Sequence, residues 1–271
     1  MSANRLLNQF TYKDSNFLSA AQIGVSRWTW EYVDHDCDID IAKNTMSQKE
    51  YDVLPIKNKD SSYTSFYSTN VWGDYSSLTK VDIDSSKRIY YKMSFRDLLK
   101  IFSAQKGNRY FFLETHDDIV GLISRVNFNS LEVYNFLYRE IADIEYQISN
   151  CFEQHIDESV IIDSFQNSSD DHNRRLVKSY QKLLDANQNN SIFHHLYFPH
   201  LGVIIDKHIN LLPEKYHSLS MYSEPFTNRF RLLRNNIAHP TKPLISTHGK
   251  FREISEILIE FDKIRSILNS D

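Results

Sequence analysis

An arginine, an amide and a histidine lie close together in the C-terminal part of the chain, in the segment Arg-Asn-Asn-Ile-Ala-His. These residues are Arg234, Asn235 and His239. An arginine can hold a phosphate through paired charge-assisted hydrogen bonds, an amide can orient it, and a histidine can transfer a proton near neutral pH. The three types of side chain together suit the cleavage of a phosphodiester bond in RNA. The segment is therefore the candidate catalytic site.

The residues around this segment predict a helix that positions it. Apolar residues recur there at intervals of four, three and four, namely Phe226, Phe230, Leu233 and Ile237. Asn235 and His239 are four apart and share a face of such a helix, which Pro240 would end. Arginine and histidine at this spacing also occur on solvated helix faces and as helix caps. The spacing alone thus leaves a purely structural role open.

The segment resembles the signature of the HEPN superfamily, often written Arg-Asn-x-x-Ala-His, and matches it at Arg234, Asn235, Ala238 and His239. The resemblance implies an all-α helical bundle and, as in ribonuclease members, a metal-independent site duplicated in a homodimer or higher homo-oligomer. RNA is then the substrate, and the product carries a 2',3'-cyclic phosphate. Some HEPN domains are not catalytic, so a module that binds a nucleotide or a protein is the alternative.

The charge of the chain limits how it can bind nucleic acid. The formal net charge is −4 and the isoelectric point is about 6.3, whereas proteins that coat nucleic acid need clustered positive charge. Arg229 and Arg231 lie beside Arg234 and are the candidate RNA-binding residues, with a solvated helix face as the other interpretation. The charge thus argues against a protein that coats nucleic acid but still allows a nuclease with one small RNA-binding face.

The cysteines and histidines give no expectation of a metal site. Cys37 and Cys151 are isolated, which indicates neither a disulfide framework nor a zinc ribbon and favours a reducing cytoplasm. His194, His195 and His200 lack a carboxylate at a helical offset, so we expect them to pack in the core or on the surface. The sequence shows no apolar run of membrane-spanning length and no signal-peptide pattern, so no membrane partner is expected.

An order of elements appears twice in the first half of the chain. Strands are predicted at 28–33, 53–56 and 63–69, with a helix at 41–51, and about 57 residues later a similar order returns. That second set has strands at 89–91, 110–113 and 119–123, with a helix at 94–104 that Ser94 would cap. Such a unit gains a core by pairing with its duplicate.

The second unit resembles a CBS domain. The resemblance rests on Phe111-Phe112-Leu113, a turn, and the run from Ile119 to Ser124 with Asn127 three residues later. It implies that Gly121 permits close approach of an adenine nucleotide, Ser124 binds its phosphate and Asn127 binds its ribose. In the first unit, Pro55 lies in a hydrophobic strand that would line the adenine pocket. A dimer platform without ligand is the alternative.

The sequence therefore predicts an α+β protein. A pair of CBS-like (Bateman-type) α/β units fills residues 1–130, the first at about 28–80 and the second at about 87–130, and a HEPN helical bundle fills 131–271. The predicted function is a dimeric, metal-independent endoribonuclease controlled by an adenine nucleotide. Such pairings of sensor and nuclease resemble toxins or antiviral effectors.

Overall fold

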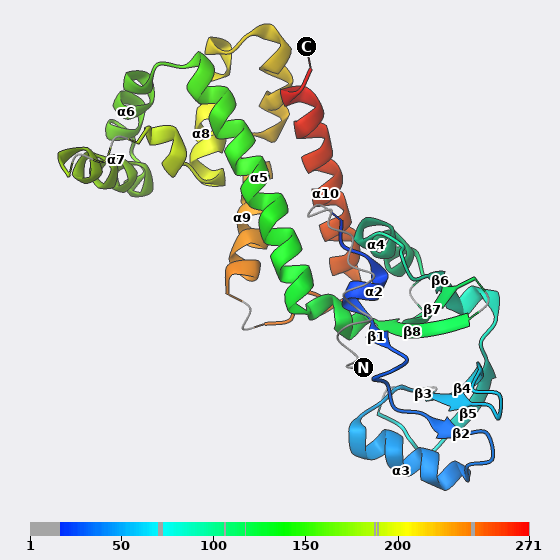
Figure 1. Cartoon of the computed structure of the whole chain (residues 1–271). Coiled ribbons are helices and arrows are strands. Elements are labelled where there is room, and N and C mark those ends of the chain that lie inside the picture. The colour runs from blue at the N-terminus through cyan, green and yellow to red at the C-terminus, as the bar shows by residue number, and fades with distance from the viewer. Residues whose placement is uncertain are drawn as a thin grey trace. The chain divides into compact units, whose positions relative to one another are not determined.

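The computed structural model describes residues 17–69, 73–105, 107–116, 118–186, 188, 190–239 and 242–270, apart from the side chains of 224–227. The chain divides into two compact units, Met1–Val133 and Tyr134–Asp271 (Figure 1). The first unit carries two small sheets, and the second is helical in its described residues. The predicted α+β class, with a helical C-terminal part, is confirmed at this level.

Each sheet of the N-terminal unit has four strands. The first sheet has the order β2 (Val33–Asp34), β3 (Val53–Lys57), β4 (Tyr63–Thr69) and β5 (Leu78–Asp82). The second has the order β6 (Arg88–Tyr90), β7 (Tyr110–Thr115), β8 (Asp118–Ser124) and β1 (Val25–Ser26). The remaining helical segments of this unit are α2 (Ala20–Ile23), α3 (Ile39–Lys49), η1 (Ser85–Lys87), α4 (Phe95–Ala104) and η2 (Arg125–Asn129).

The two sheets repeat one topology. In each, a parallel pair is joined by a helix, α3 between β2 and β3 and α4 between β6 and β7. An antiparallel hairpin follows in each, β3 with β4 and β7 with β8. The predicted internal repeat is thus confirmed. The fourth strands differ in origin, because β5 follows β4 directly whereas β1 comes from the beginning of the described chain.

Alternating side chains place the core of this unit on both faces of each sheet. Phe112 of β7 lies 5.1 Å from Phe66 of β4 between ring centroids, so these faces of the two sheets pack on each other. Phe111 points to the other face, where its ring centroid lies 5.1 Å from that of Phe102 in α4. Adjacent residues of a strand face opposite sides, so one aromatic run fills two layers.

The strand predicted at 28–33 is wrong over most of its length. Residues 27–29 form a turn, in which the backbone N–H groups of Thr29 and Trp30 donate to the carbonyl of Ser26 at 2.9 and 3.0 Å. Trp30 is buried, and its ring packs edge-on against Tyr63 with centroids 4.8 Å apart. Trp30 is therefore a core residue that follows a turn and is not part of a strand. The strand β2 begins only at Val33.

The helical unit contains six α-helices within its described residues, and α5 begins just before it. They are α5 (Leu131–His155), α6 (Glu158–Gln166), α7 (Asp171–Asp185), α8 (Phe198–His208), α9 (Glu224–Ala238) and α10 (His248–Leu268), with short η3 (Ile192–His195), η4 (Ile209–Leu211) and η5 (Glu214–Tyr222). The predicted apolar stripe of α5 is buried throughout, at Leu137, Ile141, Ile144, Ile148 and Phe152. None of the helices in the described ranges has the length and apolarity that a bilayer crossing requires.

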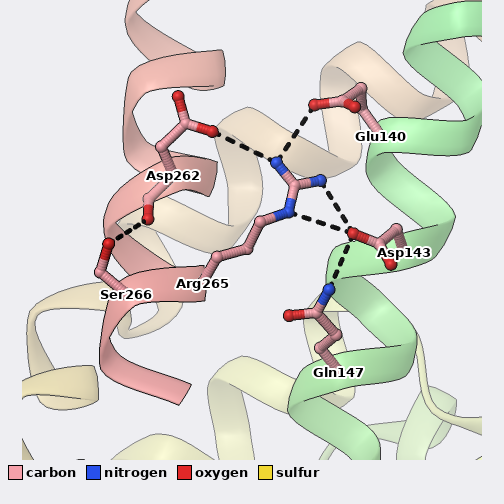
Figure 2. A network of polar contacts seen from close by, with 6 residues as sticks. All are labelled: Glu140, Asp143, Gln147, Asp262, Arg265 and Ser266. Carbon is pink, nitrogen blue, oxygen red and sulfur yellow. Dashed lines mark hydrogen bonds and ion pairs between the residues drawn. The ribbon is translucent and has the colours of Figure 1, made fainter. Parts of the chain in front are cut away.

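An arginine of α10 joins that helix to α5. Arg265 donates to Glu140 at 3.2 Å and to Asp143 at 2.9 and 3.1 Å, and it also contacts Asp262 of its own helix (Figure 2). Asp143 accepts a further hydrogen bond from Gln147. The side chain of Arg265 is 22% exposed, so these contacts stabilise the packing of the two helices more than a fully solvated pair would.

Candidate functional site

Helix α9 positions Arg234 at the boundary between the core and the solvent. Phe230, Leu233 and Ile237 of the predicted stripe are buried, while the side chain of Phe226 lies outside the described residues. Arg234 follows Leu233 directly, so it leaves the helix at the margin of the buried stripe. Its side chain is 29% exposed.

Two residues from other segments hold the guanidinium of Arg234. Its Nε lies 3.7 Å from Oε2 of Glu145 in α5, and its central carbon lies 4.6 Å from the ring centroid of Tyr197, which precedes α8. Cation–π contacts of this kind are electrostatically favourable. The carboxylate lies nearest the inner nitrogen, and within the described residues the two terminal nitrogens donate no hydrogen bond. They are the donors that a phosphate would use.

Glu145 is the buried partner in this arrangement, with 12% of its side chain exposed. Burial raises the pKa of its carboxyl group, and the hydrogen bond from the Phe198 N–H and the charge of Arg234 act in the opposite direction. The Phe198 N–H donates to Oε1 at 3.1 Å. The carboxylate therefore connects α5 to the first turn of α8 and to Arg234 in α9.

A cleft of about 370 Å³ lies beside these residues. It is lined by residues of α5 and by the segment from η3 to the start of α8: Ala142, Glu145, Tyr146, Ser149, Asn150, Phe193, His194, Leu196 and Tyr197. Two of these, Glu145 and Tyr197, are the residues that hold Arg234. The arginine itself does not line the cleft, but it is held by two residues that do.

Asn235 and His239 are exposed on the surface of the helical unit. The backbone N–H of His239 donates to the carbonyl of Asn235 at 3.1 Å, and α9 ends at Ala238 with His239 as its C-terminal cap residue. Pro240 lies outside the described residues. The following segment is anchored by Tyr134, whose hydroxyl donates to the carbonyl of Lys242 and accepts from the N–H of Leu244.

The two candidate RNA-binding arginines differ in their surroundings. Arg229 donates to Glu256 of α10 at 3.1 Å, so part of its charge is already neutralised within the protein. Arg231 is exposed on α9. Arg231 is therefore the more accessible of the two side chains.

The clustered histidines lie in separate environments. His200 is buried and accepts a hydrogen bond from the Tyr197 N–H at 3.2 Å, and its ring stacks on His172. Burial, and secondly His172, lower the pKa of His200 to about 4, which keeps it neutral. His194 is exposed and lies 3.3 Å from Glu153. In the described part of the chain, no His, Cys, Asp and Glu side chains gather in a group of three or more that could hold a metal ion.

In the N-terminal unit, Gly121 is required by the neighbouring strand. A Cβ at this position would meet the carbonyl oxygen of Val25 in β1 at 2.6 Å. The resemblance to a CBS domain explains a glycine at position 121 by the close approach of a nucleotide. The structure gives a second reason for a glycine there, the close pairing of β8 with β1.

Ser124 and Asn127 bind each other at the end of β8. The backbone N–H and the hydroxyl of Ser124 both donate to Oδ1 of Asn127, at 2.7 and 2.9 Å, and so cap the short helix η2. Pro55 is buried in β3, opposite Phe66 of β4. Ser124 and Asn127 therefore form one turn that their mutual hydrogen bonds hold in place.

Two arginines that the sequence did not single out lie near this turn. Arg109, just before β7, donates to the carbonyl of Thr69 at 2.7 Å and lies 3.6 Å from Asp52. Arg125 follows Ser124 directly, and burial, together with the charge of Arg109, lowers the pKa of its guanidinium. The guanidinium groups of Arg109 and Arg125 are thus close enough to repel each other, and an anion that bound beside them would reduce this repulsion. The signal in the sequence was the position of each arginine at the end of a strand.

Comparisons with known proteins place the chain in no family. No protein-family model matches it, and no curated protein matches it. A solved structure titled "Crystal structure of CBSX2 in complex with AMP" shares 15% sequence identity and has a TM-score of 0.33. That match covers 40% of this chain and 91% of the other.

Proposed function

We propose that the chain is a metal-independent endoribonuclease, active as a homodimer, whose N-terminal unit binds an adenine nucleotide that controls it. The observation that supports the nuclease is the fixed guanidinium of Arg234. Glu145 contacts its Nε, the ring of Tyr197 lies against its central carbon, and its terminal nitrogens donate no hydrogen bond to a residue that the structure describes. Preorganised donors of this kind stabilise charge that develops on a phosphate.

In the proposed reaction, the 2'-oxygen of a ribose attacks the adjacent phosphorus and the bond from phosphorus to the 5'-oxygen breaks. One proton leaves the 2'-hydroxyl and one is given to the departing 5'-oxygen. Two groups are needed for these transfers, and a homodimer would supply one His239 from each subunit. Arg234 stabilises the phosphoryl oxygens, Asn235 orients them, and the product carries a 2',3'-cyclic phosphate.

The test is cleavage of labelled RNA in the presence of a chelator, with analysis of the new ends. The parent should give 2',3'-cyclic ends, and Arg234→Ala and His239→Ala should each slow cleavage by at least about 100-fold, as the loss of one stabilising or proton-transferring group does. Arg252→Ala is a matched control, because Arg252 of α10 is exposed and pairs with Glu256. Equal rates for the parent and both variants would refute the proposal.

Polar and charged residues at the start of β7 and the end of β8 support the proposal that the N-terminal unit binds a nucleotide. The turn of Ser124 and Asn127 supplies polar groups, and Arg109 and Arg125 supply positive charge for phosphates. A ligand that binds the folded unit must raise its melting temperature. We expect a rise with one of AMP, ADP, ATP or a cyclic adenylate, diminished in Arg109→Gln and kept in the control Arg27→Gln, which lies at the other end of β8 beside Asp118.

The biological role follows from the proposed activity. A nuclease under the control of a nucleotide would act as a toxin or antiviral effector in its host cytoplasm. Expression of the parent should then arrest bacterial growth, and expression of His239→Ala to the same level should not. Arrest by both proteins would separate toxicity from RNA cleavage.

A further inference from the structure

The cleft beside Arg234 has walls suited to a flat aromatic ligand. Tyr146 and Tyr197 line it from α5 and from the start of α8, and their side chains are exposed at 63% and 45%. Arg234, which does not line the cleft, covers one face of the Tyr197 ring. Phe193 is buried, so the exposed ring of Tyr146 offers a ligand in the cleft an aromatic surface to stack on.

The cleft also carries a side chain that can recognise the edge of a base. Asn150 lines it, and its amide makes no hydrogen bond to any residue that the structure describes. An amide offers one acceptor and two donors, and in nucleic-acid recognition it pairs with the N6 and N7 positions of adenine. Tyr146 and Asn150 are four apart on α5, so they project from the same side of the helix.

The size of the cleft and its position fit one nucleotide. A volume of 370 Å³ is near the lower limit of small-molecule sites, which begin at about 300 Å³. Proteins that bind single-stranded RNA combine cationic groups for the backbone with aromatic rings for the bases. Here Tyr197 lines the cleft and also contacts Arg234, so the cationic group lies next to the aromatic cleft.

We propose that this cleft binds one adenine base of the RNA strand, stacked on Tyr146 and recognised by Asn150, while Arg234 holds the neighbouring phosphate. The inference rests on the proposed ribonuclease function and adds a specificity for the base next to the cleavage point. The site is separate from the nucleotide site proposed for the N-terminal unit, because all its residues belong to the helical unit.

The test is binding of 2'-O-methyl oligonucleotides, which lack the attacking hydroxyl and cannot be cleaved. Anisotropy of labelled A, C, G and U homopolymers is measured with the full chain. The parent should prefer the A homopolymer by about tenfold, the lower range of discrimination by a paired amide contact. Asn150→Ala should remove that preference, and Tyr146→Ala should weaken binding of every homopolymer by about tenfold.

Two matched variants of the same helix serve as controls. Tyr138→Ala and Asn135→Ala remove an exposed tyrosine and an exposed asparagine of α5 that do not line the cleft, and both should bind as the parent does. Binding without base preference, or equal losses in the cleft variants and their controls, would overturn the inference even if RNA is cleaved. Base-specific binding without any cleavage would uphold the site and refute the nuclease.

Discussion

Replacement of Glu145 by glutamine tests how the candidate site is held together. Glutamine keeps the size of the side chain and an oxygen that can accept the Phe198 N–H, but it removes the charge that faces Arg234. At 3.7 Å and an effective dielectric constant of about 20, the attraction lost is about 4 kcal/mol before solvation is counted. Burial of the carboxylate costs several kcal/mol, so the two terms nearly cancel in the folding free energy.

The expected result is a separation of stability from catalysis. Glu145→Gln should unfold at nearly the same temperature as the parent, but Arg234 should lose part of its orientation. An arginine side chain carries about 2 kcal/mol of rotamer entropy, so its release would slow RNA cleavage by up to about 30-fold. Glu253→Gln is the matched control, since it removes one carboxylate from a solvent-exposed pair with Lys250 in the same unit.

The dependence on pH gives a second measurement. Burial raises the pKa of Glu145, so the folded state binds its proton at a higher pH than the unfolded state does. The contribution of Glu145 to the free energy of unfolding is then greatest below the pKa of an ordinary glutamate. It falls as the pH rises through the raised pKa of the folded state. Protonation also frees Arg234, so cleavage by the parent should decline on the acid side, and Glu145→Gln should lack that decline. Equal rates and equal pH profiles in both proteins would refute the assigned role.

Three further predictions concern stability. Gly121→Ala should destabilise the N-terminal unit by about 1–3 kcal/mol in thermal melts, because the new Cβ meets a backbone carbonyl, whereas Gly107→Ala, in open space, should change little. Arg265→Met should lower the unfolding free energy of the helical unit by about 1–3 kcal/mol in urea titrations, since Glu140 and Asp143 lose their cation; an unchanged midpoint would contradict this. His200 is held neutral with a pKa of about 4, so its contribution is complete above about pH 6.5 and is lost toward pH 4, amounting to about 3 kcal/mol. His200→Gln should therefore lose less melting temperature on acidification than the parent, and equal losses would exclude the role.

Periodicity predicted the elements that bury a regular face. The repeat of helix and hairpin in the first half, and the stripes of α5 and α9, were all visible as apolar spacing. The strands β1 and β5 were missed because one has only two residues and the other is mostly exposed, so neither carries an alternating pattern. The strand expected at Trp28–Val33 failed because aromatic content indicates a residue suited to burial but not its backbone conformation: Trp30 is buried just after a turn, while Trp28 and Tyr32 are exposed.

The sequence predicted the motif residues of the candidate site but not the residues that hold Arg234. Arg234 and His239 are close in sequence and formed a motif, but Glu145 and Tyr197 come from distant segments and meet Arg234 only through the packing of α5 and α8 on α9. One signal did exist for Glu145: it follows Ile144 directly in the apolar stripe of α5. A carboxylate at the margin of a buried stripe needs a partner, and the partner cannot be named without the fold.

The charge of the chain explains why the site depends on such partners. With a formal net charge of −4, the protein offers little long-range attraction to a polyanion, so the proposed binding of RNA would depend on short-range contacts at fixed positions. A solvated arginine loses much of its energy to side-chain entropy, whereas Arg234 is already ordered by a carboxylate and a ring. Arg109 is held in a similar way by Asp52 and the carbonyl of Thr69. In both units, an arginine is thus held in place by contacts within the protein, which lowers the entropy that binding of a phosphate would cost.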